Sequence, residues 1–212
     1  YAQLSQASVN LIGRIVIAEK SIEDGAVTFL ASPESHWLPW NDASLVLSST
    51  KLNSRTGPAF LSPSVGLAQQ LQTTREIAPI SYEMMESFSV ELKARPSVFI
   101  SYIWAAATDI LPALLPALSE AGFAIWVDRW SGPRRFKDGR NLQPADLVTK
   151  FIADAVVKSD LVVALVSDEY DTSRWTSLET SLAQENSKPI VRLPLAEIRK
   201  HTQAGTLAIF LN

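Results

Sequence analysis

The residues in this sequence best suited to chemistry are a tryptophan and a glutamate four positions apart, Trp175 and Glu179, in the stretch SRWTSLETSLAQEN. A spacing of four places two side chains on one face of an α-helix, about one turn apart. An ionised carboxylate can stabilise a positive charge that develops on a substrate, or it can act as a nucleophile. The pair follows the apolar run LVVALVS, so it lies close to the end of a buried segment.

A structural role for Glu179 fits the same spacing. In the segment TSLE, Thr176 can take the N-cap position of a helix and Glu179 the N3 position, where its side chain bonds back to the Thr176 N–H. Glu179 would then be an exposed capping residue. If the helix begins at Ser173 or earlier, Glu179 lies a full turn inside it and can face the ends of neighbouring strands. The spacing alone leaves both arrangements open.

The composition limits which other chemistry is available. The chain has no cysteine and its two histidines are His36 and His201, which excludes thiolate chemistry and disfavours a histidine-rich metal site. We expect no metal and no bound cofactor. A chain without cysteine suits a reducing compartment, and we expect a cytoplasmic location. Because the chain begins with Tyr1 and not Met, we also expect it to be part of a longer protein.

The charge and hydropathy pattern disfavours two classes of partner. The net charge is −3, without the basic excess that is typical of a nucleic-acid-binding protein. No stretch reaches the ~20 consecutive apolar residues of a membrane span. We therefore expect no direct binding to nucleic acid and no insertion into a membrane.

Alternating strand and helix patterns position the candidate residues in the second half of the chain. Four short apolar runs are typical of strands buried on both faces: SVFISY, FAIWV, LVVALVS and PIVRLPL. Amphipathic patterns between them predict helices from near Pro112 to Gly122, over 144–160, and over the segment that carries Glu179, with an open loop at 103–110. This order predicts an α/β fold with a flavodoxin-like open parallel sheet.

The first part of the chain, residues 1–90, is predicted to be a smaller, strand-containing region of uncertain fold. The runs GRIVIA, AVTFLA and SLVLSS look like strands separated by turn residues. His36, Trp37 and Trp40 cluster in SHWLPW and could line a site, although clustered aromatic residues more often anchor a core or an interface. We divide the chain into residues 1–90, a candidate sensor or partner-binding region, and residues 96–212.

Polar and aromatic residues gather at the predicted carboxyl ends of the strands. Open parallel sheets bind ligands at these ends, near the point where the strand order reverses. We expect the following residues to bind the substrate: Tyr102, Ile103, Trp104, Trp126, Asp128, Ser167 and Trp175. Trp126 is equally consistent with a core residue, because tryptophans in strands are usually buried.

The loop after the second predicted strand is strongly basic. Its positively charged residues are Arg129, Arg134, Arg135, Lys137 and Arg140, against a single acidic residue, Asp138. Such a run can be a solvated surface, can hold a diphosphate, or can contact an acidic patch of a neighbouring subunit.

The segments SVFISY, GFAIWVD, IADAVVKSDLVVALVSDEYDTSRWTSLE and KPIVRLPL resemble successive conserved boxes of TIR (Toll/interleukin-receptor) domains, over roughly residues 96–200. The resemblance implies self-association through the loop after the second strand. In NAD⁺-cleaving members, a glutamate four residues after a tryptophan is catalytic, which corresponds to Glu179 and Trp175. In the same NAD⁺-cleaving members, an aromatic residue at the position that corresponds to Trp126 lies against the nicotinamide ring. The resemblance thus implies a bacterial enzyme that takes NAD⁺ as substrate in an immune, antiphage or cell-death pathway.

These residues are sufficient for that chemistry. The nicotinamide of NAD⁺ is a pyridinium, so it leaves as a neutral molecule and needs no general acid. One ionised glutamate can stabilise the ribosyl cation that remains, by its charge or by a transient covalent bond. An aromatic ring can hold the pyridinium by cation–π attraction. Glu179 must be ionised near neutral pH, which predicts a partly polar pocket.

Other functions also fit the sequence. A non-catalytic TIR adaptor would act by assembling with other TIR domains, and a nucleoside N-ribosyl transferase would use one glutamate on a similar fold. A phosphoacceptor receiver domain is disfavoured, because its first strand should end in acidic residues that bind magnesium, whereas this strand ends in SYIW.

Overall fold

The chain is described here by a computed structural model, which covers residues 13–14, 16–23, 26–34, 36–41, 46, 49–51, 76–128 and 145–211. These residues belong to two compact units. One unit contains the described residues from 41 to 94, and the other contains those from 13 to 40 and from 95 to 211. Outside the described residues lie the predicted loop residues Arg129, Arg134, Arg135, Lys137 and Arg140.

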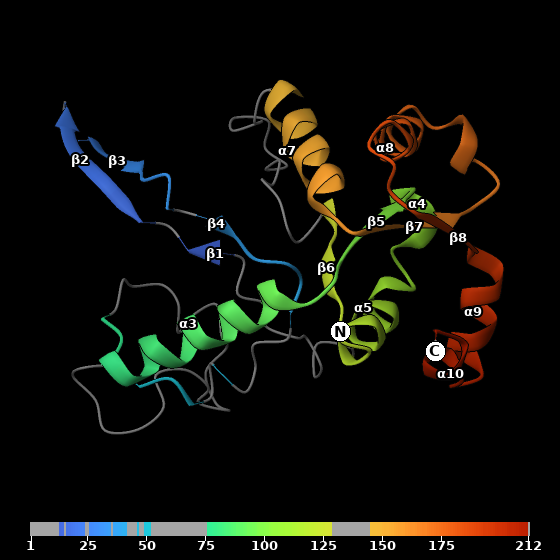
Figure 1. Cartoon of the computed structure of the whole chain (residues 1–212), viewed down its shortest axis with the longest axis horizontal. Helices are drawn as coiled ribbons and strands as arrows, with labels where there is room; N and C mark the ends of the chain where they lie inside the picture. The colour runs from blue at the N-terminus through green and yellow to red at the C-terminus, as the bar shows by residue number, and fades with distance from the viewer. Residues whose placement is uncertain are drawn as a thin grey trace. The chain divides into compact units, whose positions relative to one another are not determined.

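A four-stranded parallel sheet forms the centre of the second unit (Figure 1). Its strands are β5 (Ser97–Tyr102), β6 (Ala124–Trp126), β7 (Leu161–Val166) and β8 (Ile190–Pro194). Their order in the sheet is β6-β5-β7-β8, so the chain passes from β5 to β6 on one side and then crosses to β7 on the other. The strand order therefore reverses between β5 and β7, where flavodoxin-like folds bind their ligands. The predicted fold class is confirmed.

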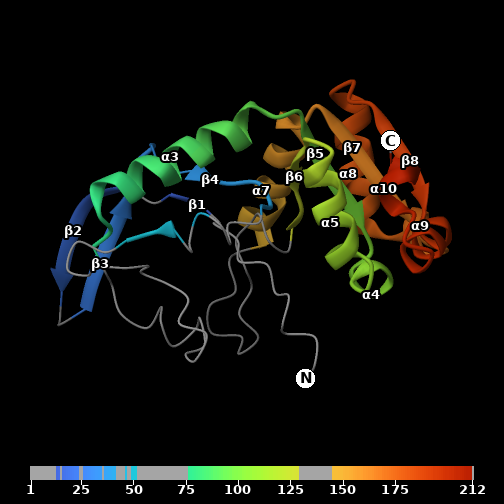
Figure 2. The ribbon, with the colours of Figure 1, turned by 90° about the horizontal axis from the view of Figure 1, so that it is seen from below.

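Helices cover both faces of this sheet (Figures 1 and 2). One face carries α5 (Leu111–Glu120), α9 (Leu195–Gln203) and α10 (Leu207–Leu211). The other face carries α7 (Ala145–Lys158) and α8 (Arg174–Glu185). Each face has its own hydrophobic cluster, as expected for strands that are apolar on both sides.

The alternation of side chains along β5 decides which of its residues faces α8. Val98, Ile100 and Tyr102 belong to the cluster beneath α5, whereas Phe99 belongs to the cluster beneath α7 and α8. Successive side chains of a strand point to opposite faces, so Ser101 lies on the same face as Phe99. Ser101 is completely buried. The hydroxyl group of Ser101 is thereby directed toward α8.

The segment between β5 and α5 differs from the prediction. We expected an open loop over 103–110, but this segment includes a one-turn helix, α4 (Trp104–Ala107). α5 then begins at Leu111 with a proline in its first turn. A proline is tolerated there because the first N–H groups of a helix have no partner within the helix.

The N-terminal part contains strands in antiparallel pairs, β1 (Gly13–Arg14) with β4 (His36–Trp37), and β2 (Ile17–Glu23) with β3 (Ala26–Ala31). The predicted strand AVTFLA is β3, the predicted run GRIVIA contains β1 and the start of β2, and β4 was not predicted. The predicted strand SLVLSS is wrong, because Val46 and Ser49 are helical. The hydroxyl group of Thr50 donates to the Val46 carbonyl, four residues back, as in a helical turn. The first unit also contains the long helix α3 (Pro79–Ala94), which was not predicted.

Trp40 attaches the N-terminal segment to the parallel sheet. Its N–H donates to the Ile125 carbonyl at 2.6 Å, forming an antiparallel bridge on the edge strand β6. Its side chain is buried in the cluster beneath α5, which confirms the core interpretation for this residue. The side chains of His36 and Trp37 lie outside the described part of the structure. The division of the chain at residues 90–96 stays a prediction.

Among the helices that the structure describes, none has the length and apolar composition needed to cross a membrane.

Candidate active site

Glu179 lies inside α8 and faces the sheet. The helix begins at Arg174, and its N-cap residue Ser173 has extended backbone angles and no side-chain capping bond. Glu179 is therefore a full turn inside the helix, and its side chain is only 6% exposed. The capping-box interpretation is wrong. Thr176 is itself helical, and its hydroxyl group donates to the backbone carbonyl of Tyr170.

A serine of β5 holds the carboxyl group of Glu179. The Ser101 hydroxyl donates to Glu179 Oε2 at 2.5 Å, and the Ser101 Oγ atom also lies 2.6 Å from the Tyr170 hydroxyl oxygen. Tyr170 begins the short 3₁₀ helix η2 (Tyr170–Thr172) and is 1% exposed. Three buried polar side chains, from β5, η2 and α8, thus form a hydrogen-bonded group near the carboxyl end of β5.

The burial of Glu179 changes its ionisation. Removal of solvent from the carboxylate raises the pKa of Glu179 to about 8, from an ordinary value of 4.5. The hydrogen bond from Ser101 lowers the pKa and so opposes this rise, whereas the negative charge of Asp128 adds to it. At neutral pH most Glu179 side chains are therefore protonated. This carboxyl group is therefore less solvated than it would be in the partly polar pocket that we expected.

The structure places the predicted binding residues of β5 and β6 on different faces of the sheet. Trp126 is half-buried and packs against the cluster beneath α7 and α8, the face that also carries Glu179. Tyr102 lies on the opposite face, in the cluster beneath α5. Its hydroxyl group donates to Asp128 Oδ1 at 2.7 Å, so these two residues are joined at the strand ends.

Two of the predicted aromatic residues are exposed. Trp175 is 43% exposed and precedes Glu179 by one helical turn, and Trp104 on α4 is 54% exposed. Ile103 is half-buried and is the N-cap residue of α4. Exposed tryptophans offer large flat surfaces for an aromatic ligand or for a protein partner.

The hydroxyl group of Ser167 is buried at the carboxyl end of β7. Within the described part of the chain it is the buried side-chain oxygen that has no hydrogen-bond partner. β7 lies beside β5 in the sheet, with Ala164 opposite Ser101, and the strand order reverses between these two strands. Ser167 follows directly after β7. Buried polar groups in proteins are nearly always paired. The Ser167 hydroxyl is therefore an exception at this end of the sheet, and its predicted role in substrate binding stays a prediction.

A family model of the TIR domain matches residues 98–209, more than half of the chain. The chain belongs to the TIR-domain family. The match includes Ser101, Tyr170 and Glu179, whereas the strands β1 to β4 and the helix α3 lie outside it. No curated protein matches the chain. The described residues of this TIR-domain protein include no cluster of three or more histidine, aspartate or glutamate side chains that could hold a metal ion.

Ser101 and Tyr170 were missed in the sequence analysis of the TIR domain. Ser101 carried a usable signal, because it is a polar residue in a continuous apolar strand and lies two positions after Phe99. Tyr170 carried none. Its hydroxyl group reaches Ser101 across 69 positions of sequence, a contact that the tertiary fold alone creates.

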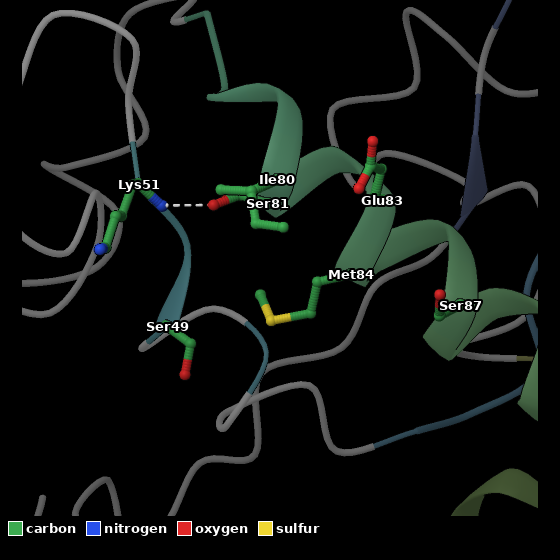
Figure 3. A pocket seen from close by; sticks show the side chains of 7 residues that line it. All are labelled: Ser49, Lys51, Ile80, Ser81, Glu83, Met84 and Ser87. Atoms are coloured by element: carbon green, nitrogen blue, oxygen red, sulfur yellow. Dashed lines mark hydrogen bonds between the residues drawn. The ribbon is translucent and has the colours of Figure 1, made fainter.

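A separate cavity lies in the other unit, outside the residues that match the TIR domain (Figure 3). It has a volume of about 540 Å³ and is lined by Ser49, Lys51, Ile80, Ser81, Glu83, Met84 and Ser87. The Lys51 N–H donates to Ser81 Oγ at 2.8 Å, and the Met84 side chain extends from α3 toward Ser49. The role of this region in sensing or partner binding stays a prediction.

The interpretation of Trp126 as a core residue can be tested by substitution. Because it is half-buried against the cluster beneath α7 and α8, we expect Trp126→Ala to lower the free energy of unfolding by about 2 kcal/mol, less than for a fully buried aromatic ring. Trp126→Phe should retain most of this packing. Urea denaturation measures the loss. If Trp126→Ala is as stable as the wild type, Trp126 has no packing role.

Proposed function

We propose that this TIR domain cleaves NAD⁺ at the bond between nicotinamide and ribose, with Glu179 as the catalytic carboxylate. The observation that carries the proposal is the position of Glu179. Its buried carboxyl group accepts a hydrogen bond from Ser101, next to the point where the strand order reverses. Flavodoxin-like folds bind ligands at this point. The exposed Trp175, one turn before Glu179, is suited to contact an aromatic part of the same ligand.

The proposed reaction requires one charged group. The bond between C1′ of the ribose and the pyridinium nitrogen breaks, and its electron pair moves to that nitrogen, so that nicotinamide leaves as a neutral molecule. The ionised Glu179 stabilises the ribosyl cation that forms. The oxygen of a water molecule then bonds to C1′ and a proton is released, giving ADP-ribose. In cyclisation, a nucleophilic atom of the same ADP-ribosyl group takes the place of water.

The substrate itself supplies a reason for Glu179 to ionise. A nearby cation favours the charged form of a carboxyl group and lowers its pKa. Because the pyridinium of NAD⁺ is positively charged, its arrival beside Glu179 opposes the effect of burial. In this proposal the buried carboxyl group becomes fully active when substrate is bound. The hydroxyl group of Ser167 and the carboxylate of Asp128 are the polar groups proposed to orient the substrate at the same strand ends.

In this proposal, the whole chain acts as a bacterial NAD⁺-cleaving enzyme of the cytoplasm in an immune, antiphage or cell-death pathway, without a metal or a bound cofactor. Residues 1–90 then bind the signal or the partner that activates it.

Incubation of the purified chain with NAD⁺ tests the function. We expect release of nicotinamide, faster at pH 8.5 than at pH 6, since ionisation of Glu179 is favoured above its pKa of about 8. Chromatography of the products distinguishes ADP-ribose from a cyclic form. No release of nicotinamide at any pH between 6 and 9, at high protein concentration, would contradict the proposal.

The same burial favours a second candidate function. A glutamate that is 6% exposed and protonated at neutral pH can serve as a structural residue of a non-catalytic TIR adaptor. An adaptor would bind other TIR domains and leave NAD⁺ intact at every pH.

The other alternative, a nucleoside N-ribosyl transferase, is tested by adding a nucleoside without a diphosphate to the same assay.

Self-association through the basic loop is part of the proposal. We expect the double variant Arg134→Glu, Arg135→Glu to have lower activity than the wild type while keeping the melting temperature of the wild type. Light scattering measures self-association, the NAD⁺ assay measures activity over a range of protein concentrations, and thermal denaturation measures the melting temperature. The matched control reverses Lys150 and Lys158, two exposed charges of α7, to glutamate. Equal behaviour of the two double variants would remove the loop from the proposal.

A further inference from the structure

The segment that follows β5 is bonded to α9 by one arginine side chain. Arg199 of α9 reaches Asp109 and Ala106, which lie 90 and 93 positions away in the sequence. Its Nε atom donates to Asp109 Oδ2 at 3.1 Å, and its Nη2 atom donates to Asp109 Oδ1 at 3.0 Å. The Nη2 atom also donates to the Ala106 carbonyl at 2.5 Å. These bonds hold α4 beside α9, as Figure 2 shows.

The geometry of this contact is more specific than that of an ordinary surface ion pair. A guanidinium that donates in parallel to both oxygens of a carboxylate forms a planar fork that an ammonium group cannot reproduce. The hydrogen bonds from Arg199 also lower the pKa of Asp109 below its ordinary value of 3.8. The side chains of Arg199 and Asp109 are 41% and 61% exposed, so solvent weakens their attraction. The contact is thus specific in geometry and moderate in strength.

The one-turn helix α4 depends on contacts of this kind. The N–H groups of Ala106 and Ala107 both donate to the Ile103 carbonyl, which closes the turn. A single helical turn is unstable by itself in water, because its few hydrogen bonds do not offset the lost backbone freedom. Ala107 and Ile110 fix one side of the segment in the cluster beneath α5. Arg199 fixes it at a second place and gives the Ala106 carbonyl a donor from outside the helix.

The same segment begins at the candidate active site. Ser101, which holds Glu179, lies on β5 two positions before Ile103. Trp104 is the first residue of α4 and is 54% exposed. Ile103 and Trp104 are both predicted to bind the substrate. Because flavodoxin-like folds bind ligands at these strand ends, the position of α4 determines where Trp104 lies relative to such a ligand.

We propose that Arg199 is a positioning residue for the substrate, because its bonds to Asp109 and Ala106 fix α4 in the orientation that receives NAD⁺. The role toward the substrate rests on the proposed function. The bonds to the segment do not, since they form in the folded protein without substrate. Arg199 is not proposed to touch the reacting atoms, so it acts on substrate binding and not on bond cleavage.

Removal of the guanidinium is expected to change KM and not kcat. In Arg199→Gln, binding of NAD⁺ must also order α4, so we expect KM to rise about fivefold, the effect of a contact of moderate strength. The value of kcat should equal that of the wild type, because Glu179 and Ser101 are unchanged. Initial rates of nicotinamide release over a range of NAD⁺ concentrations measure both constants.

Asp109→Asn separates positioning from simple attraction between Arg199 and an anionic substrate. If the positive charge of Arg199 only attracts the diphosphate of NAD⁺, loss of the negative charge of Asp109 should lower KM. If Arg199 acts by holding α4, Asp109→Asn should raise KM, because it weakens the contact. Arg199→Lys should likewise raise KM, although it keeps the charge, because an ammonium group cannot form the fork.

Hydrogen–deuterium exchange of the full chain without NAD⁺ tests the contact itself. The amide protons of Ala106, Ala107 and Ile110 are bonded within the segment, so they exchange when it opens. We expect a peptide that covers residues 103–110 to exchange about fivefold faster in Arg199→Gln, and also faster in Asp109→Asn. The double variant should exchange no faster than Arg199→Gln, since both substitutions remove the same contact.

Lys200→Gln is the matched control. Lys200 is the neighbour of Arg199 on α9, and its ammonium group lies 3.7 Å from a carboxylate oxygen of Glu197 on the same helix. The substitution therefore removes one positive charge from α9 without removing a bond to the segment. Its KM and its exchange over residues 103–110 should equal those of the wild type.

Unchanged exchange in both Arg199→Gln and Asp109→Asn would overturn the proposal. Faster exchange with an unchanged KM, or a lowered KM in Asp109→Asn, would also overturn it. If one of the two variants does not fold, the other decides alone. A wild type that does not cleave NAD⁺ would reject the proposed function, and faster exchange in the variants would still support Arg199 as the residue that holds α4. An active wild type with unchanged exchange in the variants would reject the role of Arg199 alone.

Discussion

Replacing Glu179 with glutamine is expected to reduce kcat for NAD⁺ cleavage by about 10³-fold, which corresponds to about 4 kcal/mol of transition-state stabilisation. Glutamine keeps the size of the side chain and an oxygen that can accept the Ser101 hydrogen bond, but it cannot carry the negative charge. The charge matters mainly while the bond to nicotinamide breaks, so KM should change little. Initial rates of nicotinamide release over a range of NAD⁺ concentrations measure both constants.

Glu185→Gln is the matched control for this substitution. Glu185 lies on the same helix but is exposed, so its neutralisation removes one negative charge from α8 without touching the candidate site. Its kcat should equal that of the wild type. Near-wild-type cleavage by Glu179→Gln would withdraw the catalytic assignment and favour the adaptor.

The second large effect is expected in the pH dependence of stability. In the unfolded chain Glu179 ionises near pH 4.5, but in the folded protein burial raises its pKa to about 8. Between these values the folded state holds a proton that the unfolded state has lost, so a rise in pH favours unfolding. The stability contribution is complete below pH 4.5 and is lost as the pH rises through 8. At about 1.4 kcal/mol per pH unit, the loss is about 5 kcal/mol at most.

Urea denaturation of the wild type and Glu179→Gln measures this loss. The glutamine variant cannot titrate at this position, so the difference in free energy of unfolding between the two proteins isolates the contribution of Glu179. We expect the wild type to lose several kcal/mol relative to the variant between pH 4.5 and pH 8.5. A difference that stays constant with pH would mean that Glu179 is well solvated.

Much of the TIR fold could be predicted because its strands have local signals. SVFISY and LVVALVS are apolar at nearly every position, which is typical of strands covered on both faces, and amphipathic helices between them require a parallel sheet. The N-terminal part was harder. SLVLSS has the composition of a strand, yet Val46 and Ser49 are helical, since short apolar runs fit either structure.

The sequence by itself determined the TIR family, the parallel sheet and the pairing of Trp175 with Glu179 on one helix, because spacing and hydrophobic pattern are properties of the chain. It left open whether Glu179 caps the helix or faces the sheet. That was decided by tertiary structure: Thr176 bonds to the Tyr170 carbonyl, and α8 begins at Arg174. Burial and the hydrogen bond from Ser101 are likewise contacts between distant segments, and they set the pKa of the carboxyl group, which no local pattern encodes.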